Sequence, residues 1–326
     1  MRSTITIAAA LVCALSSAAP AQTRSEAGYP DKPIRLIVPN APGSSNDVLG
    51  RALALRLSEV LGQQIVVDNR AGAAGVIGVE IAVKAAPDGY TLVSASSGSH
   101  SVAPHIYKKL PYDPLNDLAP VALYAINPNL LAVNPSLGVG NVRELIQLMK
   151  AKPGQLNMAS AGQGSTSHLA AALFAAMAGV KAVHVPYKGG GPSIAAVIAN
   201  EAQWVFTPLA GPLPHVRSGR LKALAVGGSH RTPLLPEVPT VAEAGVPGYN
   251  SNGWNGIMVP RATPKAIVAK LNAAIVKVLN TPELRDQFAL QGTEPATGTP
   301  AQFDQFIRTE YERYGRAVKL AGIQID

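Results

Sequence analysis

The stretch RLIVPNAPGSSND, residues 35–47, begins with an apolar strand pattern, continues through small or amide-bearing residues, and ends where a helical pattern begins. The same order recurs in LNMASAGQGSTSHLAAALF, residues 156–174, where a strand pattern leads through small and hydroxyl residues into a helix. In open α/β sheets, ligands bind at the carboxyl ends of strands, where such loops enter helices. These two loops are therefore the candidate binding loops.

Both loops suit an anion. Small residues let the backbone approach a ligand closely, and the free N–H groups of a helix N-terminus favour negative charge. The hydroxyl groups of Ser44, Ser45, Ser165, Thr166 and Ser167 can also donate to a carboxylate. The alternative is local, because Ser, Thr, Asn and Asp are ordinary N-cap residues and Gly is an ordinary turn residue. One such loop alone favours the cap, and the pair together favours ligand contact.

Strand and helix patterns alternate along the rest of the chain. Short apolar or β-branched runs closed by Gly, Pro, Asn or Ser predict strands, among them two separate ones at APVALYA (119–125) and NLLAVN (129–134). Apolar residues at helical spacing predict helices. The predicted helices cover residues 46–62, 142–151, 167–179, 264–280 and 301–321. This alternation is typical of the doubly wound α/β class, with parallel-rich sheets covered on both faces.

The first residues have the composition of an export signal. Arg2 precedes an apolar core at residues 5–15 that is too short to span a bilayer, and Ala19-Pro20-Ala21 is a cleavage site of the A-x-A type. We therefore predict a signal peptide over residues 1–21, and a soluble, periplasmic mature protein. The single cysteine, Cys13, lies inside that segment, and the bulky Val12 before it argues against a lipoprotein signal. The mature chain can form no disulfide.

The charge balance is basic, with 28 Lys and Arg against 20 Asp and Glu. Nucleic acid is nevertheless excluded as a partner, because the basic residues occur singly or in pairs, without a basic stripe or interleaved aromatic residues. A mild positive field that attracts anionic solutes is the more useful inference.

Several ordered stretches carry a resemblance to a known family. They are YPDKPIRLIVPNAPGSSNDVLGR, VVDNRAGAAGVIG, KAAPDGYTLVSASSGSHSVAP, YKKLPYDPLNDLAPVAL, KAKPGQLNMASAGQGSTSHLA, VHVPYKGGGPSI and PEVPTVAEAGVPGY. Over its whole mature length the chain resembles the Bug family of extracytoplasmic solute receptors, which are the substrate-binding proteins of tripartite tricarboxylate transporters.

The resemblance implies a type II periplasmic binding protein, with two doubly wound α/β lobes and a hinged cleft that holds a small organic carboxylate. We expect residues 22–126 and 247–326 to form lobe 1 and residues 127–246 to form lobe 2, with the terminal helices packed against lobe 1. Two connections at the floor of the cleft would permit hinge closure. The implied partner is the membrane permease of such a transporter. We expect a monomer without a cofactor.

Carried over onto this sequence, the family's contacts fall on residues 39–47, 96–99 and 160–168 and on one position after them. The implied ligand-binding residues are Asn40, Ala41, Gly43, Ser44, Ser45, Asp47, Ser96, Ser97, Ser99, Ser160, Gly162, Gln163, Gly164, Ser165, Thr166, Ser167, His168 and Thr207. Asp47 is expected to cap the helix or orient its loop, because a carboxylate would repel a carboxylate ligand. Lys188, in a Gly-rich turn, is expected to be solvated.

Two of these positions depart from the family pattern. Asn40 stands where the family often has an aromatic residue, which predicts a ligand with additional polar groups or one bridged by waters. Thr207 stands where many relatives carry an aspartate. If that aspartate pairs with a ligand ammonium group, its absence disfavours cationic amino acids and weakens the case for aspartate or glutamate as the ligand.

Other function classes have weaker support. No G-x-S-x-G elbow, H-E-x-x-H, Walker A or G-x-G-x-x-G motif occurs. His168 beside three hydroxyl residues keeps a serine hydrolase as a remote alternative, although no third orienting group is evident. The stronger alternative is a sensory protein that uses the same binding lobes to signal to a membrane receptor.

Overall fold

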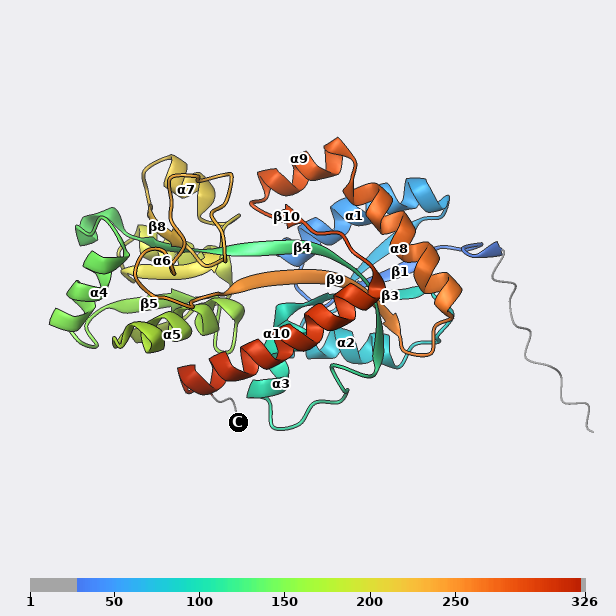
Figure 1. Cartoon of the computed structure of the whole chain (residues 1–326), viewed down its shortest axis with the longest axis horizontal. Helices are drawn as coiled ribbons and strands as arrows, with labels where there is room; N and C mark the ends of the chain where they lie inside the picture. The colour runs from blue at the N-terminus through green and yellow to red at the C-terminus, as the bar shows by residue number, and fades with distance from the viewer. Residues whose placement is uncertain (1–27, 324–326) are drawn as a thin grey trace, which may run out of the picture.

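The computed structural model describes residues 28–323, so the predicted signal peptide and Cys13 lie outside the described residues. Two lobes lie side by side along the long axis of the molecule (Figure 1). Within residues 28–323, no helix has both the length and the apolar character needed to cross a membrane. In chain order the elements are β1 (Ile34–Val38), α1 (Ser45–Leu61), β2 (Ile65–Asn69), η2 (Ala73–Gly75), α2 (Val76–Val83), β3 (Thr91–Ser96), η3 (Gly98–Val102), α3 (Ala103–Ile106), β4 (Leu118–Val133), η4 (Pro135–Leu137), α4 (Val142–Ala151), β5 (Asn157–Ser160), α5 (Thr166–Ala178), β6 (Val183–Pro186), α6 (Gly190–Ile198), β7 (Trp204–Pro208), α7 (Leu213–Arg217), β8 (Lys222–Val226), β9 (Asn252–Pro260), α8 (Lys265–Leu279), α9 (Pro282–Leu290), β10 (Glu294–Pro295) and α10 (Pro300–Ala321).

The sheet of the first lobe has the strand order β2-β1-β3-β9-β4. Strand β1 is parallel to β2 and β3, whereas β9 is antiparallel to β3 and β4. Alternate residues of β1 enter different cores, because successive side chains of a strand point to opposite faces. Leu36 packs with α1 and α8, and Ile37 packs with α2 and the start of α10. Both faces of this sheet are therefore covered, as the alternation of patterns predicts.

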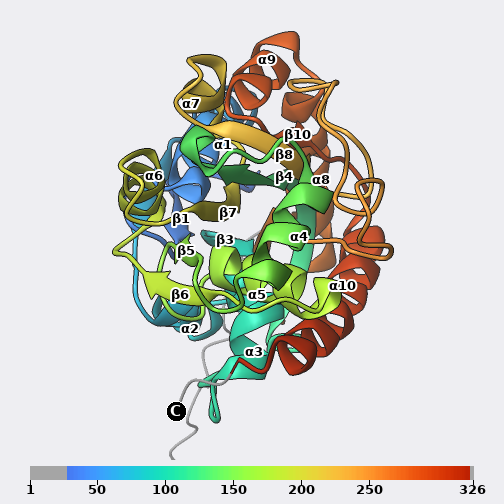
Figure 2. The same ribbon diagram turned by 90° about the vertical axis from the view of Figure 1, so that its left-hand side faces the viewer.

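The sheet of the second lobe is built in the same way. Strand β5 is parallel to β6 and β7, and the second half of β4 lies antiparallel between β7 and β8. Leu131 faces the core under α4 and α5, whereas Leu130 faces the core under α6 and α7. Figure 2, which looks onto this lobe, shows α5 and α6 on opposite sides of its sheet. The carboxyl ends of β5, β6 and β7 lead into the loops that face the first lobe.

Strand β4 belongs to both sheets, and the prediction of two separate strands at its place is wrong. Asn127-Pro128-Asn129 has the composition of a turn that would end a strand. In the structure, β4 passes through it as one strand of 16 residues. Tertiary contacts replace the turn that these residues favour. The amide of Asn127 donates to the side chain of Asn255 (2.5 Å), and the amide of Asn129 donates to the carbonyl oxygen of Ser251 (2.7 Å). The two amides thus join β4 to strand β9 and to Ser251, the residue just before β9.

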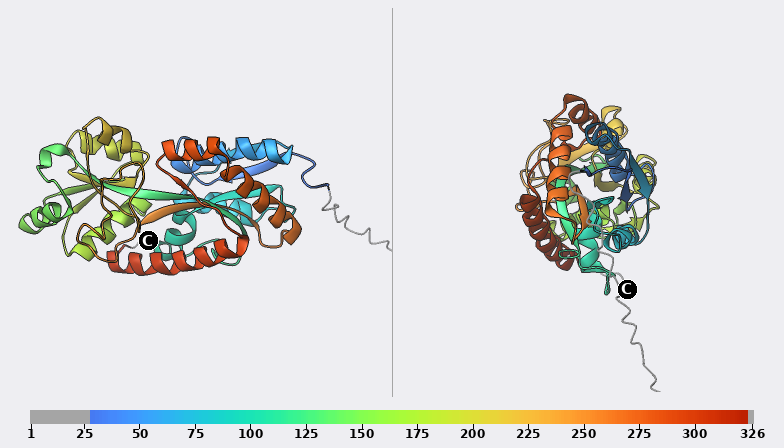
Figure 3. Two further views of the ribbon diagram at one scale, coloured as in Figure 1. Left: turned by 45° about the horizontal axis from the view of Figure 1, so that its top comes forward. Right: turned by 90° about the vertical axis from the view of Figure 1, so that its right-hand side faces the viewer.

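The last helix, α10, spans both lobes, so the prediction that the terminal helices pack against lobe 1 is wrong for its second half. Its first turns bury Phe303 and Ile307 in the first lobe, whereas Tyr314 and Val318 belong to the core under α5. Figure 3 shows α10 running beneath both lobes. The hydroxyl group of Tyr314 donates to the carbonyl oxygen of Asn252 (2.5 Å), at the start of β9. Helices α8 and α9 do pack on the first lobe.

Gly256 of β9 provides a test of this packing. A Cβ atom at this position would overlap the ring of Phe303, because α10 lies directly on the strand. We expect Gly256→Ala to lower the free energy of unfolding by about 1–3 kcal/mol, the usual cost of overpacking a core. Denaturant unfolding measures this change, with Gly28→Ala as the control because a Cβ at Gly28 meets no neighbour. Equal midpoints for the two variants would contradict the packing of α10.

Candidate functional site

A cavity of about 730 Å³ lies between the two lobes, which both contribute residues to its lining. The first lobe supplies the start of α1 and Gln291, which follows α9. The second lobe supplies the starts of α5 and α6, one face of α6, and the segment after β7. A volume of this size is typical of small-molecule binding sites.

The start of α1 is shaped by Gly43 and Ser44. Gly43 has a φ of 78°, a left-handed conformation that glycine adopts without strain, and it turns the loop into the helix. The hydroxyl oxygen of Ser44 caps the helix by accepting from the N–H group of Asp47 (3.3 Å). Ser45, the first helical residue, and Val48 also line the cavity. The cap therefore places the helix start at the cavity wall.

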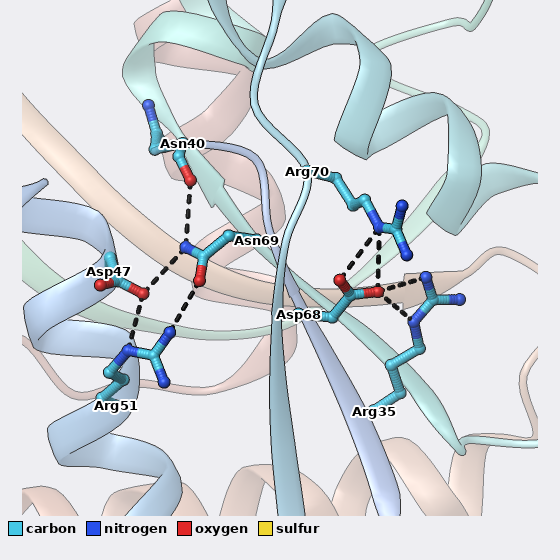
Figure 4. Close-up of polar contacts among 7 residues, drawn as sticks. All are labelled: Arg35, Asn40, Asp47, Arg51, Asp68, Asn69 and Arg70. Atoms are coloured by element: carbon cyan, nitrogen blue, oxygen red, sulfur yellow. Dashed lines mark hydrogen bonds and ion pairs between the residues drawn. The ribbon is translucent and has the colours of Figure 1, made fainter. Parts of the chain in front are cut away.

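Asp47 fixes this loop from behind. Its carboxylate accepts from the backbone N–H of Gly43 (2.8 Å). It also accepts from the amide of Asn69 (2.9 Å) and from Nε of Arg51 (2.9 Å), as Figure 4 shows. Burial alone would raise the pKa of Asp47, but the bonds from Gly43, Arg51 and Asn69 outweigh it and hold the pKa below its usual value. Asp47 does not line the cavity, and its bond to Gly43 joins it to the loop that it is expected to orient.

The arginines near this loop are engaged with carboxylates. On the opposite side of β2 from Asn69, Asp68 pairs with Arg35 and Arg70 (Figure 4). Arg51 pairs with Asp47. Each of the three nearby guanidinium groups is thus engaged with a carboxylate, and the free backbone N–H groups at the start of α1 add positive partial charge at the cavity wall.

Asn40 is held away from the cavity. Its side-chain oxygen accepts from the amide of Asn46 (2.8 Å), and that amide also donates to the carbonyl oxygen of Ser94 (3.0 Å). Asn40 lies behind the loop and does not line the cavity. The polar group predicted to contact ligand at this position is thus bonded to Asn46 of α1, and Asn46 in turn bonds to β3.

The start of α5 is capped in the same way as the start of α1. The hydroxyl oxygen of Ser165 caps the helix by accepting from the N–H group of His168 (3.2 Å), and the same hydroxyl donates to the carbonyl oxygen of Gly162 (2.7 Å). The hydroxyl oxygen of Ser167 accepts from the N–H group of Ala161 (2.8 Å). These bonds close the loop on itself, so that Ala161, Thr166 and Ser167 form the cavity wall.

The side chain of His168 makes contacts within its own lobe. Its ring stacks on that of His184 with centroids 3.7 Å apart, and its Nδ1 accepts from the N–H group of Gly164 (3.2 Å). Burial and the neighbouring ring of His184 lower the pKa of His168 to about 4. The hydroxyl of Ser160 lies 2.6 Å from Nε2 of His184, a serine–histidine pair that the sequence did not predict. Among residues 28–323 no carboxylate orients that histidine, so the pair lacks the third member of a triad.

The start of α6 is a third helix N-terminus in the same cavity, and the sequence analysis missed it. Its N-cap, Gly189, offers no side-chain cap, and Gly190 and Gly191 line the cavity with their backbone. The pattern VHVPYKGGGPSI again passes from a strand through small residues into a helix. The signal was overlooked because the loop lacks the hydroxyl residues of the other two. Lys188 is exposed and outside the cavity lining, as predicted.

The three helix starts share one feature. Ser45 of α1, Thr166 and Ser167 of α5, and Gly190 and Gly191 of α6 line the cavity at the first helical positions. Within residues 28–323, no backbone or side-chain acceptor takes the N–H groups of these residues. The first N–H groups of a helix are unsatisfied by the helix itself and carry its positive partial charge. The cavity therefore receives donors for an anion from both lobes.

The predicted ligand-binding residues divide into two groups. Those that line the cavity are Gly43, Ser44, Ser45, Thr166, Ser167 and Thr207. Those that lie outside its lining are Asn40, Ala41, Asp47, Ser96, Ser97, Ser99, Ser160, Gly162, Gln163, Gly164, Ser165 and His168. The second group mostly forms the loops behind the wall.

The segment after β3 is turned inward. Ser99 is fully buried, and its hydroxyl bonds with the backbone of Ser96 (3.2 Å) and with Nδ1 of His100 (3.0 Å). Trp204 and Trp254 are also fully buried and pack in the cores. Thr207, by contrast, is buried at the cavity wall beside the start of α6.

The cavity is also lined by side chains that no sequence pattern singled out. Arg220 and His215 come from the turn after α7 and from α7 itself. Gln291 comes from the first lobe, and Gly292 beside it packs against Leu209 and Ala210 after β7. Apolar residues, among them Ile194 and Pro208, form much of the remaining lining.

Comparison with known proteins places the chain among solute receptors. The model of the tripartite tricarboxylate transporter family receptor, TctC, matches residues 49–323. Protein BugT of Bordetella pertussis is 39% identical over 298 residues, which cover 91% of this chain and 91% of that protein.

Solved structures give the same result. The structure of R. palustris Rpa4515 with adipate has a TM-score of 0.84 and 36% identity, and the match covers 91% of this chain and 99% of that one. The structure of MatC (Rpa3494) from Rhodopseudomonas palustris with bound malate has a TM-score of 0.80 and 32% identity, covering 89% of this chain and 100% of that one. The two-lobed α/β fold predicted from the sequence is thus confirmed.

Asp47→Asn tests the support behind α1. We expect the variant to lose about 1–3 kcal/mol of unfolding free energy at pH 7, because bonds to a buried carboxylate are weakened or left unmade. Since folding lowers the pKa of Asp47, its stabilisation is present above the unfolded pKa of about 3.9 and is lost as the pH falls through the folded value. The difference between wild type and variant should therefore shrink in acid.

Denaturant unfolding between pH 7 and pH 3 measures this effect. Asp304→Asn is the matched control, since its ion pair with Arg308 is largely exposed and should contribute less than about 1 kcal/mol. A difference for Asp47→Asn that stays constant through the acid range would show that its carboxylate does not titrate as the contacts require.

Proposed function

The chain belongs to the tripartite tricarboxylate transporter receptor family, and from this premise we propose that it captures a small organic carboxylate between its lobes and delivers it to a membrane permease. As a member of this family it is a binding protein and not an enzyme. The observation that carries the proposal is the convergence of three helix N-termini on one cavity.

Carboxylate is the ligand class that this arrangement favours. Free N–H groups at helix starts bind anions, and a carboxylate has acceptor sites for several donors at once. Within residues 28–323, the lining of the cavity includes no acidic side chain that would repel it. The structures of two relatives were determined with adipate and with malate, both of which are carboxylates.

We assign ligand contact to the predicted residues that line the cavity, Gly43, Ser44, Ser45, Thr166, Ser167 and Thr207. The remaining predicted residues act by holding the loops in place. Among the described residues, we propose that lobe 1 comprises residues 28–126 with 247–323 and lobe 2 residues 127–246, with the second half of α10 packed across onto lobe 2. Closure of these lobes on the carboxylate would bend the chain where β4 and β9 cross between them.

Location and delivery follow from the family and the predicted export signal. A receptor cleaved after residue 21 would act in the periplasm, where the permease of its transporter is accessible. The net charge of +8 would draw anionic solutes toward the receptor. We propose the monomer as the working unit, since both walls of the cavity come from one chain.

Ser45→Asp tests the ligand class. An acidic residue in the first turn of α1 suits the helix dipole, so the variant should fold, but its charge would face the bound carboxylate. We expect at least a tenfold loss of affinity for any carboxylate that binds the wild type. The neutral Ser45→Asn is the matched control and should retain most of the affinity.

Isothermal titration against mono-, di- and tricarboxylates and amino acids provides the measurement. In cells, replacement of the wild type by Ser45→Asp should reduce uptake of the same carboxylate in parallel. A wild-type protein that binds no carboxylate would overturn the proposal, and normal uptake with the Ser45→Asp receptor would overturn the role in delivery.

Thr207 provides a separate test of selectivity. It is buried at the cavity wall, at the position where the family resemblance implies an aspartate. We expect wild type to prefer carboxylates without an amino group, and Thr207→Asp to gain affinity for an amino acid by pairing with its ammonium group. Titration with aspartate and glutamate measures the gain, with Thr207→Asn as the neutral control. No gain for any amino acid would refute this role of position 207.

A further inference from the structure

The second connection between the lobes is a short segment at the start of β9. Tyr249 belongs to the core of the second lobe under α5, whereas Trp254 belongs to a core of the first lobe. The chain therefore passes from one lobe to the other within residues 250–253. A hinge works by changing the backbone angles of a few residues of this kind. The contacts that hold these residues thus bear on the angle between the lobes.

Side chains of α10 hold the backbone of this segment. A terminal nitrogen of the Arg313 guanidinium group donates to the carbonyl oxygen of Asn250 (2.6 Å), and the hydroxyl group of Tyr314 donates to that of Asn252 (2.5 Å). We call these two bonds the α10 clamp. The carbonyl oxygen between them, that of Ser251, is held from β4. A change of backbone angles at residues 250–252 would break these bonds.

Helix α10 is fixed to both lobes on either side of the clamp. Phe303 and Ile307 lie in a core of the first lobe, and Val318 lies in the core under α5. The helix runs beneath both lobes (Figure 3). Its only proline, Pro300, is the first helical residue, and an α-helix without an internal proline bends only gently. The clamp therefore holds the connection against a stiff element that both lobes share.

The guanidinium group of Arg313 is itself held in place. Nε and a terminal nitrogen donate to the two carboxylate oxygens of Glu310 (2.7 and 2.6 Å), and the group lies 4.3 Å from the ring centroid of Tyr314. The side chains of Arg313 and Glu310 are only 20% and 12% exposed. By contrast, Arg316 and Glu312 of the same helix are 4.0 Å apart and 73% exposed. Only the first pair has the two parallel bonds that fix a guanidinium group.

From these contacts we propose that Arg313, together with Tyr314, is a positioning residue of the hinge. By holding the carbonyl oxygen of Asn250 on α10, it sets the angle between the lobes at which the cavity has both its walls. The proposal rests on the proposed function and adds to it the residues that control how often the unbound receptor has this arrangement. If the fraction of molecules at this angle falls about fivefold, the affinity for a ligand that needs both walls falls about fivefold as well.

Distances between two spin labels, one on each lobe, measure the angle by double electron–electron resonance. The only cysteine of the chain, Cys13, lies in the predicted signal peptide, so labels can be placed selectively on the mature protein. Leu55→Cys on α1 and Lys150→Cys on α4 provide exposed sites, one on each lobe and both outside the cavity lining. We expect a narrow distance distribution for this labelled receptor.

Removal of the clamp should broaden that distribution. Glu310→Gln combined with Arg313→Met removes the guanidinium group without leaving a buried carboxylate unpaired. Glu312→Gln combined with Arg316→Met is the matched control on the same helix and should leave the distribution narrow. Arg313→Lys keeps a charged donor and should give an intermediate width. Should the first double variant fail to fold, Tyr314→Phe, which loses one hydroxyl group and keeps its ring in the core, carries the same expectation.

Titration of the same proteins with succinate, adipate and citrate measures the consequence for binding. Whichever of these acids binds wild type should bind the clamp variant about fivefold more weakly and the control variant equally well. A distribution as narrow as that of wild type in the folded clamp variants overturns the proposal, and so does a broadened distribution with unchanged affinity. If wild type binds no carboxylate, the proposed function fails, whereas the distance distributions still decide whether Arg313 and Tyr314 hold the lobes.

Discussion

The continuity of β4 through both lobes is the constraint on which the rest of the structure depends. The strand pairs with β9 in the first sheet and with β7 and β8 in the second, so the two sheets cannot be placed independently. Pro128 lacks a backbone N–H group, and the amides of Asn127 and Asn129 make the cross-strand bonds at this point. Because the strand is shared, the loops after β1 and after β5, β6 and β7 face one gap.

The electrostatics of that gap arise from the backbone more than from side chains. Arg35, Arg51 and Arg70 are paired with Asp47 or Asp68, and the chain's excess of basic residues is not concentrated at the helix starts. Backbone N–H groups that are fixed by helix geometry need little reorganisation when an anion arrives. Such a site also suits a receptor that must release its ligand, since no fully charged partner holds the carboxylate at that end.

Local signals in the sequence were sufficient for the loops of residues 35–47 and 156–174, because strand, small residues and helix follow one another directly. Local signals gave wrong or no predictions where contacts between residues distant in sequence determine the structure. Asn127-Pro128-Asn129 was interpreted as a break, since its partner Asn255 is distant in sequence. Arg220 was not predicted, because only the turn after α7 brings it to the cavity. Its neighbours in sequence resemble an ordinary exposed loop.

Capping and ligand contact, which the sequence presents as alternatives for Ser44 and Ser165, are compatible in the structure. Each hydroxyl oxygen accepts from the N–H group three residues further on, at Asp47 and at His168. A cap of this kind satisfies only one of the N–H groups that a helix start leaves unpaired. The earlier ones, at Ser45 and at Thr166, remain directed toward the cavity. The cap thus orders the helix start without using the donors that an anion requires, and the α6 start reaches the same result with glycine and no side-chain cap.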